Sequence, residues 1–286
     1  MAADTVVHRD HYMMSRDPLA SGRLTAQHYL ILRRLGWLLH PDIAAQIRGL
    51  RGLEIADVAC GNAIWSLDMA VDYPHARITG IDISPQQFPP QFTWPQNVTL
   101  ELHDIFQPMP DRYAGRFDVV HVRMIMAAVY FQDKDWVMHN ILRLLKPGGF
   151  IQWTDVTVPV LRAMSDPVRY PAAFRDPPAI IAPLTSLFSH TEWLRHLAAE
   201  LQRHGLINLR HLDMPPVPWL SRQDTDNAIW ALTDIHEGLK TRAAREVSDL
   251  FGRAVHETLQ DIRQGRVYYT TYYTTIGQKP GLPWGG

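Results

Sequence analysis

The chain has 286 residues, of which 46% are hydrophobic and 20% charged, and its formal net charge is -1. These values are typical of a globular protein with a substantial core and argue against disorder, while a nearly neutral chain lacks the basic field that nucleic-acid binding needs. The single cysteine, Cys60, excludes an intrachain disulfide and argues against a thiolate zinc site.

No apolar run approaches the ~20 residues that span a bilayer, and residues 1–17 lack the hydrophobic region of a signal peptide. No third ligand accompanies His8 and His11 at metal-binding spacing, so we expect no metal site. We therefore expect a cytoplasmic protein that binds neither membranes nor nucleic acid.

The first 50 residues are expected to be irregular, then helical. Asp17-Pro18 disfavours a helix within residues 1–20. From Ser21, apolar residues recur at helical spacing until Pro41 stops the run, and a second short helix is expected over 42–50.

Strands and helices alternate between residues 51 and 157. The helix expected over 134–145 ends at Lys146-Pro147-Gly148-Gly149, which carries the cation, proline and glycines typical of a helix end, and another helix is expected over 62–73. The expected strands are 53–58, 77–82, 98–103, 117–122 and 150–156. This alternation predicts an α/β fold with a parallel sheet and helices on both faces.

The pattern changes after this region. Residues 157–186 are rich in proline, which favours a long irregular excursion. A helix over 191–203 with Thr191 as N-cap, a strand over 207–212, helices over 223–239 and 243–263, and an aromatic strand over 267–278 are expected next.

The stretch 53–70, LEIADVACGNAIWSLDMA, combines a strand, a turn of small residues and a helix. Such a turn lets a ligand lie against backbone N–H groups at the helix N-terminus. Asp82 closes the next strand, where its carboxylate can accept both hydroxyls of a ribose. A nicotinamide-dependent reductase uses a similar loop and acid, so these features alone leave that alternative open.

A family resemblance rests on five sequence segments, which occur in this order: DVACGNAIWSLDMA, GIDIS, LHDIF, FDVVHVRMIM and LLKPGGFIQWTDV. Over roughly residues 12–157 the chain resembles the class I S-adenosylmethionine-dependent methyltransferases, and within them the small-molecule methyltransferases of fungal secondary metabolism. RLTAQHYL and LLHPDI resemble the leader helix of the fungal group. The resemblance implies a Rossmann-like class I sheet, with S-adenosyl-L-methionine as cofactor and S-adenosyl-L-homocysteine as product.

The resemblance also implies a set of site residues. The first loop would meet the methionine part of the cofactor, Asp82 the ribose, and the residues from Asp104 the adenine. The residues expected to bind the cofactor are Tyr12, Arg23, Gln27, Asp57, Ala59, Cys60, Gly61, Asn62, Trp65, Asp82, Ile83, Asp104, Ile105, Phe106, Val122 and Arg123, while Met124 and Trp153 are expected at the substrate.

Several of these residues have a structural alternative: Asp82 as a strand cap, Asp104 as a turn former, and Cys60 and Trp65 as packing residues. The family's G-x-G-x-G loop carries alanine here at Ala59 and Ala63. Alanine is expected to be tolerated there only where φ is negative.

Methyl transfer is an in-line displacement that a protein assists by alignment and by excluding water, and a hydroxyl acceptor also needs a base. The candidate catalytic residues are His28, His121 and Asp155, although the pattern favours a buried, hydrogen-bonded histidine at His121.

These features predict four parts: an N-terminal helical lid (1–50), a cofactor-binding α/β core (51–157), a region of substrate-cap insertions and helices (158–266), and a terminal strand of the core (267–286). Within 158–266, the helix 191–203 and the strand 207–212 are expected to belong to the core. The predicted reaction is methyl transfer to O, N or C of a small, largely apolar secondary metabolite. The alternatives are a cofactor-binding protein without methyl transfer, either a cyclase-like enzyme or a regulator of secondary metabolism, and for residues 1–50 a packing or homodimer helix.

Overall fold

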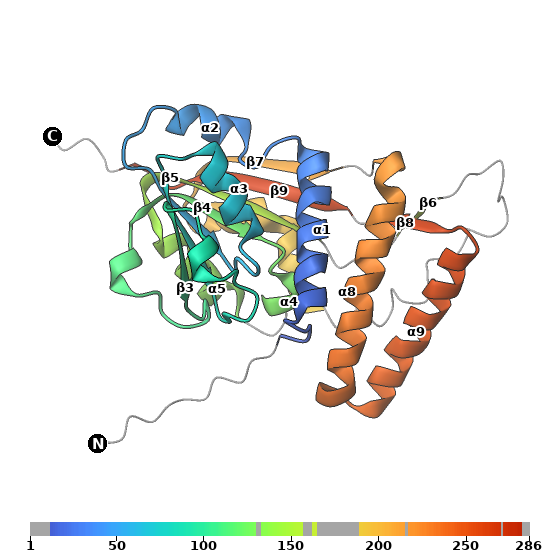
Figure 1. Cartoon of the computed structure of the whole chain (residues 1–286). Coiled ribbons are helices and arrows are strands. Elements are labelled where there is room, and N and C mark those ends of the chain that lie inside the picture. The colour runs from blue at the N-terminus through green and yellow to red at the C-terminus, as the bar shows by residue number, and fades with distance from the viewer. Residues whose placement is uncertain are drawn as a thin grey trace, which may run out of the picture.

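The computed structural model describes residues 12–129, 133–156, 162–164, 189–214, 217–269 and 271–281. Its centre is a seven-stranded sheet in the order β3-β2-β1-β4-β5-β9-β7 (Figure 1). The strands are β1 Glu54–Val58, β2 Arg77–Asp82, β3 Val98–Leu102, β4 Phe117–Arg123, β5 Leu145–Val156, β7 Ile207–Met214 and β9 Tyr272–Gln278. A separate pair joins β6 (Arg162–Met164) to β8 (Val267–Tyr269).

The sheet is mixed, because β9 is antiparallel to both β5 and β7, whereas β1 to β5 are parallel. The prediction of a parallel sheet is correct for these five strands. In the register of β9, Tyr272 pairs with Val156, the last residue of β5. The beginning of β9 therefore lies at the edge where the parallel strands end.

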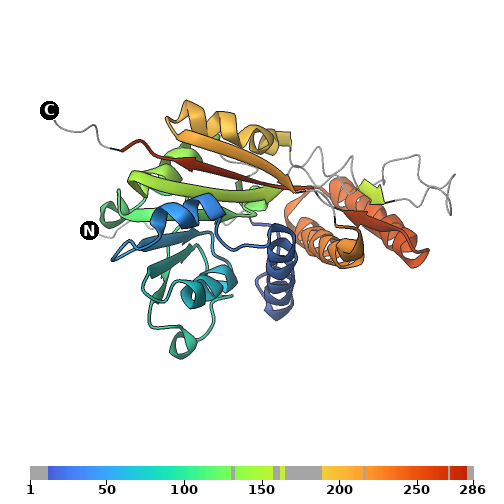
Figure 2. The same cartoon turned by 90° about the horizontal axis from the view of Figure 1, so that it is seen from above.

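Helices cover both faces of the sheet (Figure 2). They are α1 Pro18–Leu35, α2 Pro41–Ile47, α3 Ile64–Asp72, α4 Met126–Val129, α5 Lys134–Arg143, α7 Leu197–Arg203, α8 Ser221–Arg242 and α9 Arg245–Arg263, with short 3-10 turns η1 Gln91–Thr93, η2 Asp111–Tyr113, η3 Ser189–His196 and η4 Pro218–Leu220. The α8–α9 hairpin stands beyond α1, away from the sheet (Figure 1). No described helix is long and apolar enough to cross a membrane.

Strand β1 is buried on both faces, as expected for a central strand of a doubly covered sheet. Ile55 packs in one apolar cluster with Met69 of α3. Its neighbour Ala56 belongs to the opposite cluster, which contains Ile141 of α5 and Leu201 of α7. Alternate residues of one strand thus contribute to two cores.

Helix α1 begins at Pro18, so the prediction of an irregular segment up to residue 20 is wrong at its end. The Asp17 side chain accepts a hydrogen bond from the Ala20 N–H at 2.8 Å and caps the helix. Proline suits the first turn, where its missing N–H has no helical partner. The helix ends at Gly36, whose φ of 76° is left-handed.

The other predicted elements occur with shifted ends. The strand predicted over 267–278 is divided into β8 and β9, and the helix predicted over 191–203 is η3 followed by α7. The two predicted helices over 223–239 and 243–263 are α8 and α9. Most of the predicted excursion over 157–186 lies outside the described residues.

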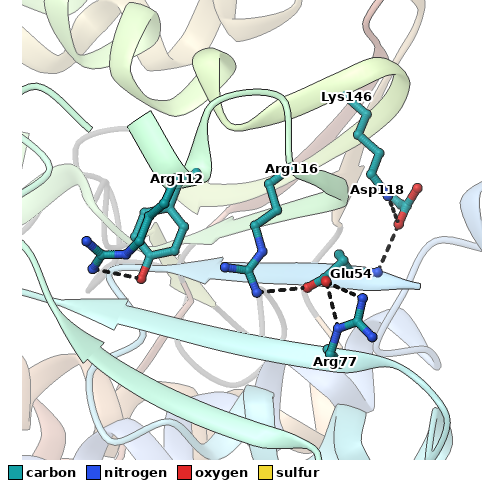
Figure 3. A network of polar contacts seen from close by, with 7 residues as sticks. Glu54, Arg77, Arg112, Arg116, Asp118 and Lys146 are labelled. Atoms are coloured by element: carbon teal, nitrogen blue, oxygen red, sulfur yellow. Dashed lines mark hydrogen bonds and ion pairs between the residues drawn. The ribbon is translucent and has the colours of Figure 1, made fainter. Parts of the chain in front are cut away.

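A polar network ties the amino ends of four strands together (Figure 3). The buried Glu54 carboxylate accepts hydrogen bonds from Arg77 Nε at 2.6 Å and Arg116 Nη2 at 3.2 Å. The Asp118 carboxylate accepts from the Glu54 N–H and from Lys146 Nζ, both at 2.8 Å. These contacts fix the sheet at the edge opposite the cavity described next.

Candidate active site

A cavity of about 450 Å³ lies at the carboxyl edge of the sheet. Its walls include Asp57 of β1, Asp82 of β2, Arg123 of β4 and Val156 of β5, together with Tyr272 of β9. Helices α1 and α8 close it from the side, and residues 12–16 reach over it. Ligands bind at this edge in open α/β sheets, so the position agrees with the sequence-based expectation.

The loop between β1 and α3, residues 59–63, contains residues with a strained, left-handed backbone. Ala59 and Ala63 have φ of 56° and 59°, so the expectation that alanine sits here only at negative φ is wrong. Each left-handed residue costs roughly 1–2 kcal/mol. Hydrogen bonds hold the loop in this form: the Cys60 N–H donates to the Ile81 carbonyl at 3.1 Å, and the Ala63 N–H to the Cys60 carbonyl at 2.9 Å.

Asp82 fixes the same loop from β2. One carboxylate oxygen accepts the Gly61 N–H at 2.8 Å and the other accepts the Ser84 N–H at 3.1 Å. Burial raises the pKa of Asp82 despite these two bonds. Each oxygen retains a further lone pair for a ligand hydroxyl. Asp82, Ile83, Cys60, Gly61 and Asn62 all line the cavity.

Asp57 lines the cavity as predicted, but His121 and Trp65 lie behind it. The Asp57 carboxylate accepts from Ser66 Oγ at 2.7 Å and pairs with His121 Nδ1 at 2.8 Å. The buried His121 ring stacks on Trp65 with centroids 3.7 Å apart, and burial lowers the pKa of His121. Neither side chain lines the cavity, although His121 was expected as a base and Trp65 as a cofactor contact. In the structure His121 supports Asp57, and Trp65 packs on the His121 ring.

His28 is also buried away from the cavity. Its Nε2 lies 3.0 Å from Asp68 Oδ2, and its Nδ1 lies 2.9 Å from Arg123 Nη1. Arg123 can only donate, so His28 accepts at Nδ1 and donates from Nε2 to Asp68. Burial, then the Arg123 charge, lower the pKa of His28 to about 4. With both nitrogens engaged, His28 positions Arg123 and cannot be the base predicted from sequence.

The adenine loop predicted after β3 lines the cavity with Asp104, Ile105 and Phe106. Asp104 accepts the Phe106 N–H at 2.9 Å, which is the turn-forming role expected as its alternative. Asn140 of α5 donates to the Ile105 carbonyl at 2.8 Å, and Trp136 to the Phe106 carbonyl at 2.7 Å. Helix α5 therefore holds this loop in place.

Beyond β4, Arg123 and Met124 line the cavity, whereas Val122 is fully buried in the core. Two predicted residues of β5 also lie outside the lining. Trp153 is fully buried against Trp193, with rings edge to face and centroids 5.8 Å apart. Asp155 is fully buried as well, so the structure places both side chains outside the cavity lining, away from the positions expected for a base and a substrate contact.

Helix α1 places Arg23 and Gln27 in the cavity wall. The Arg23 side chain is 2% exposed, and its Nε and Nη2 atoms have no hydrogen-bond partner among the described residues. The Tyr12 phenol is hydrogen-bonded to Arg23, and burial raises its pKa. A buried guanidinium with unpaired N–H groups is costly unless an anion joins it.

The sequence predicts a substrate cap from the helices within 158–266, but not which of their residues face the cavity. Helix α8 contributes Ala228, Ala231, Leu232 and Ile235, at the i, i+3, i+4, i+7 spacing of one helix face. That spacing identifies a buried face but not what it faces. The wall also includes Tyr272, for which no sequence signal stood out.

The geometry shows no metal centre: no group of three or more His, Cys, Asp or Glu in the described part of the chain is arranged to hold a metal ion.

Comparison with known proteins places the chain in a family. A family model described as a methyltransferase domain matches residues 50–195, half of the chain. The chain is 38% identical over 146 residues to the N-methyltransferase tcpN of Claviceps purpurea, covering 50% of this chain and 51% of that protein. It is 30% identical over 142 residues to the N-methyltransferase verN of Clonostachys rogersoniana, covering 49% and 48%.

The chain thus spans about half the length of the curated relatives it matches. Among solved structures, it is similar to phosphoethanolamine N-methyltransferase 2 of Haemonchus contortus in complex with S-adenosyl-L-methionine, with a TM-score of 0.45, 15% identity, and 87% of this chain and 56% of that chain covered. Because the family model matches half of the chain, the chain belongs to the methyltransferase domain family.

Proposed function

We propose that this chain transfers a methyl group from S-adenosyl-L-methionine to a nitrogen of a small, largely apolar metabolite. The observation that carries the proposal is one cavity lined by the acids Asp57, Asp82 and Asp104, from three consecutive strand ends, and by Arg23, whose buried Nε and Nη2 have no hydrogen-bond partner among the described residues. A cationic sulfonium with an amino acid at one end and a nucleoside at the other suits this charge distribution.

Different residues of the cavity would bind different parts of the cofactor. Asp82 has lone pairs for the ribose hydroxyls, and Ile83 and Ile105 offer apolar contacts to the adenine. The Arg23 guanidinium is placed to pair with the methionyl carboxylate, because charge-assisted bonds of this type are the strong ones. Gln27, one turn further along α1, lines the same end of the cavity.

The acceptor would occupy the apolar remainder of the cavity. The α8 face from Ala228 to Ile235 stands there with Met14, Met124 and Val156. Such a surface binds an apolar molecule and excludes water from the displacement. Nitrogen is proposed as the acceptor atom because the relatives from Claviceps purpurea and Clonostachys rogersoniana are named N-methyltransferases.

Arg23→Gln tests the cofactor assignment. By calorimetry, we expect S-adenosyl-L-methionine and S-adenosyl-L-homocysteine to bind about 10- to 100-fold more weakly, since a charge-assisted hydrogen bond is worth roughly 1.5–3 kcal/mol. 5′-Methylthioadenosine, which lacks the amino acid, should bind the variant and the wild type equally.

Arg33→Gln is the matched control, because Arg33 lies on the same helix with its guanidinium over the Trp219 ring and outside the cavity. The assignment is contradicted if Arg23→Gln binds S-adenosyl-L-homocysteine as tightly as the wild type does. It is also contradicted if the variant loses as much affinity for 5′-methylthioadenosine as for S-adenosyl-L-homocysteine.

Methyl transfer itself is tested by mass spectrometry after incubation with S-adenosyl-L-methionine and small cyclic amides and amines. Conversion of a substrate without formation of S-adenosyl-L-homocysteine would instead indicate the cyclase-like alternative.

A further inference from the structure

One wall of the cavity is a single run of chain, Met124–Ala128, which extends from the end of β4 into α4, and all five residues line the cavity. Met124 begins the run with φ of 56°, a left-handed conformation that side-chain-bearing residues rarely adopt. The first bond that holds it is made by its own N–H, which donates to the Thr154 carbonyl of β5 at 2.9 Å. A wall built on a strained residue requires further support.

The buried Asp155 carboxylate provides that support. Its Oδ2 accepts the Ile125 N–H at 3.2 Å, and the Met126 N–H is a further donor to this carboxyl group. Two more donors belong to β5: Trp153 Nε1 bonds to Oδ2 at 3.2 Å and the Val156 N–H bonds to Oδ1 at 2.9 Å. The side chain therefore connects the β5 end to the Ile125 and Met126 amides of the wall.

The groups around Asp155 are hydrogen-bond donors and aromatic rings. Tyr273 of β9 pairs with Asp155 in the sheet register, and its hydroxyl donates to the Val156 carbonyl at 3.3 Å. Glu192 and Arg195 of η3 act electrostatically on Tyr273. Burial raises the pKa of Asp155 to about 7, and its N–H donors oppose the increase.

We propose that Asp155 is a positioning residue, whose carboxylate sets the conformation of the Met124–Ala128 wall and thereby the orientation of the methyl acceptor. The inference rests on the proposed function only in assigning this part of the cavity to the acceptor. It replaces the role of a base, which a side chain outside the cavity lining cannot perform. Loss of the negative charge removes acceptor capacity for the wall amides, so the wall should respond to protonation.

The test follows the methyl groups of methionines by NMR, with ¹³C at the ε position, in the ligand-free chain between about pH 5 and 9. The Met124 and Met126 signals should move together with one midpoint near the Asp155 pKa of about 7. In Asp155→Asn, which preserves side-chain size, both signals should be displaced and independent of pH. Met69 and Met138, both fully buried elsewhere, should show no such movement.

Signals of Met124 and Met126 that stay fixed across this range, or that titrate equally in Asp155→Asn, would overturn the proposal. If Asp155→Asn does not fold, the wild-type titration is the test: signals that move with a midpoint near pH 7 support the proposal, and signals that stay fixed overturn it. Calorimetry with S-adenosyl-L-homocysteine is run in parallel. No binding there would overturn the proposed function, while the titration of the ligand-free chain would still test Asp155.

Discussion

At the scale of single residues, His28 and Asp155 link folding to pH in opposite directions. His28 has a folded pKa of about 4 against an ordinary value of 6.5, so the unfolded chain binds more protons between these values and stability rises with pH. Asp155 has a folded pKa of about 7 against 3.8, so the folded chain binds more protons and its contribution to stability falls as pH rises. Over the window from about pH 4 to 6.5 the two contributions cancel.

Single variants should expose each contribution. Relative to the wild type, Asp155→Asn should make the free energy of unfolding rise with pH between about pH 4 and 6.5, by up to about 1.4 kcal/mol per pH unit. His28→Gln, whose amide can still donate to Asp68 and accept from Arg123, should make it fall by a similar amount. Urea unfolding at a series of pH values measures both, and curves parallel to that of the wild type would contradict the assignment.

The same residues show why the site was only partly predictable. Asp82 and Asp104 follow strand ends, and a parallel sheet brings such positions to one edge, so they line the cavity. His121, Trp153 and Asp155 lie within strands, where alternation gives a face of the sheet but not the space beyond its edge. Their side chains pack against helices and loops instead of reaching the cavity.

At the scale of elements, the strap formed by residues 12–16 is docked on α8. The Ser15 N–H donates to Asp234 Oδ1 at 3.0 Å, and Arg242 donates to the Tyr12 carbonyl. Met13 is buried directly over Gly238, where a Cβ would overlap the Met13 carbonyl group. The strap carries Tyr12, Met14 and Arg16 over the cavity, which supports the hypothesis of an N-terminal lid.

Gly238→Ala tests this hypothesis without weakening the helix. Alanine is favoured over glycine in a helix by up to about 1 kcal/mol, so α8 itself should be stabilised. The added methyl group displaces Met13, and we expect S-adenosyl-L-homocysteine to bind about 5- to 10-fold more weakly, as for the loss of roughly one interaction of 1 kcal/mol or more. Calorimetry gives the affinity, and thermal unfolding confirms that the variant is folded.

Gly22→Ala on α1 is the control, since its Cβ would lie 3.5 Å from Trp230, an ordinary contact. Equal affinity in Gly238→Ala and Gly22→Ala would contradict the lid and favour the packing alternative for residues 1–50.

The roles of the elements were harder to predict than their existence. The βα units were recognisable because their apolar patterns and turn residues are local. The contribution of α8 depends on contacts with α1, far away in the sequence, such as the Asn227 amide donating to the Arg23 carbonyl, 204 residues earlier, at 3.0 Å. No local pattern contains that information, and the antiparallel direction of β9 was hidden for the same reason.

At the scale of the whole molecule, a buried ion pair connects two parts of the chain that are far apart in sequence. Arg34 of α1 pairs with Asp224 of α8, both side chains being 1% exposed. The Arg34 guanidinium also lies 4.9 Å from the centroid of the Tyr272 ring. The pair thus joins α1, α8 and β9 on the outer side of the cavity.

Asp224→Ala should destabilise the chain by about 3–5 kcal/mol, because it removes the carboxylate that pairs with the buried Arg34 charge. The double variant Arg34→Met/Asp224→Leu should lose much less, since apolar side chains replace a buried pair at little net cost. Urea unfolding compares the two variants, and equal losses of stability would show that the pair acts through packing alone.

The division of the chain into four parts and the homodimer both stay predictions.

The direction of β9 also has a consequence for the order in which the protein becomes functional during synthesis. Strands β1 to β5 lie within residues 54–156 and can pair as soon as they leave the ribosome. The cavity wall at Tyr272 and the strand that follows it arrive last, after α8 and α9. The cofactor loops are therefore made long before the site is closed, and a nascent chain that stops short of β9 carries the loops but not the complete cavity.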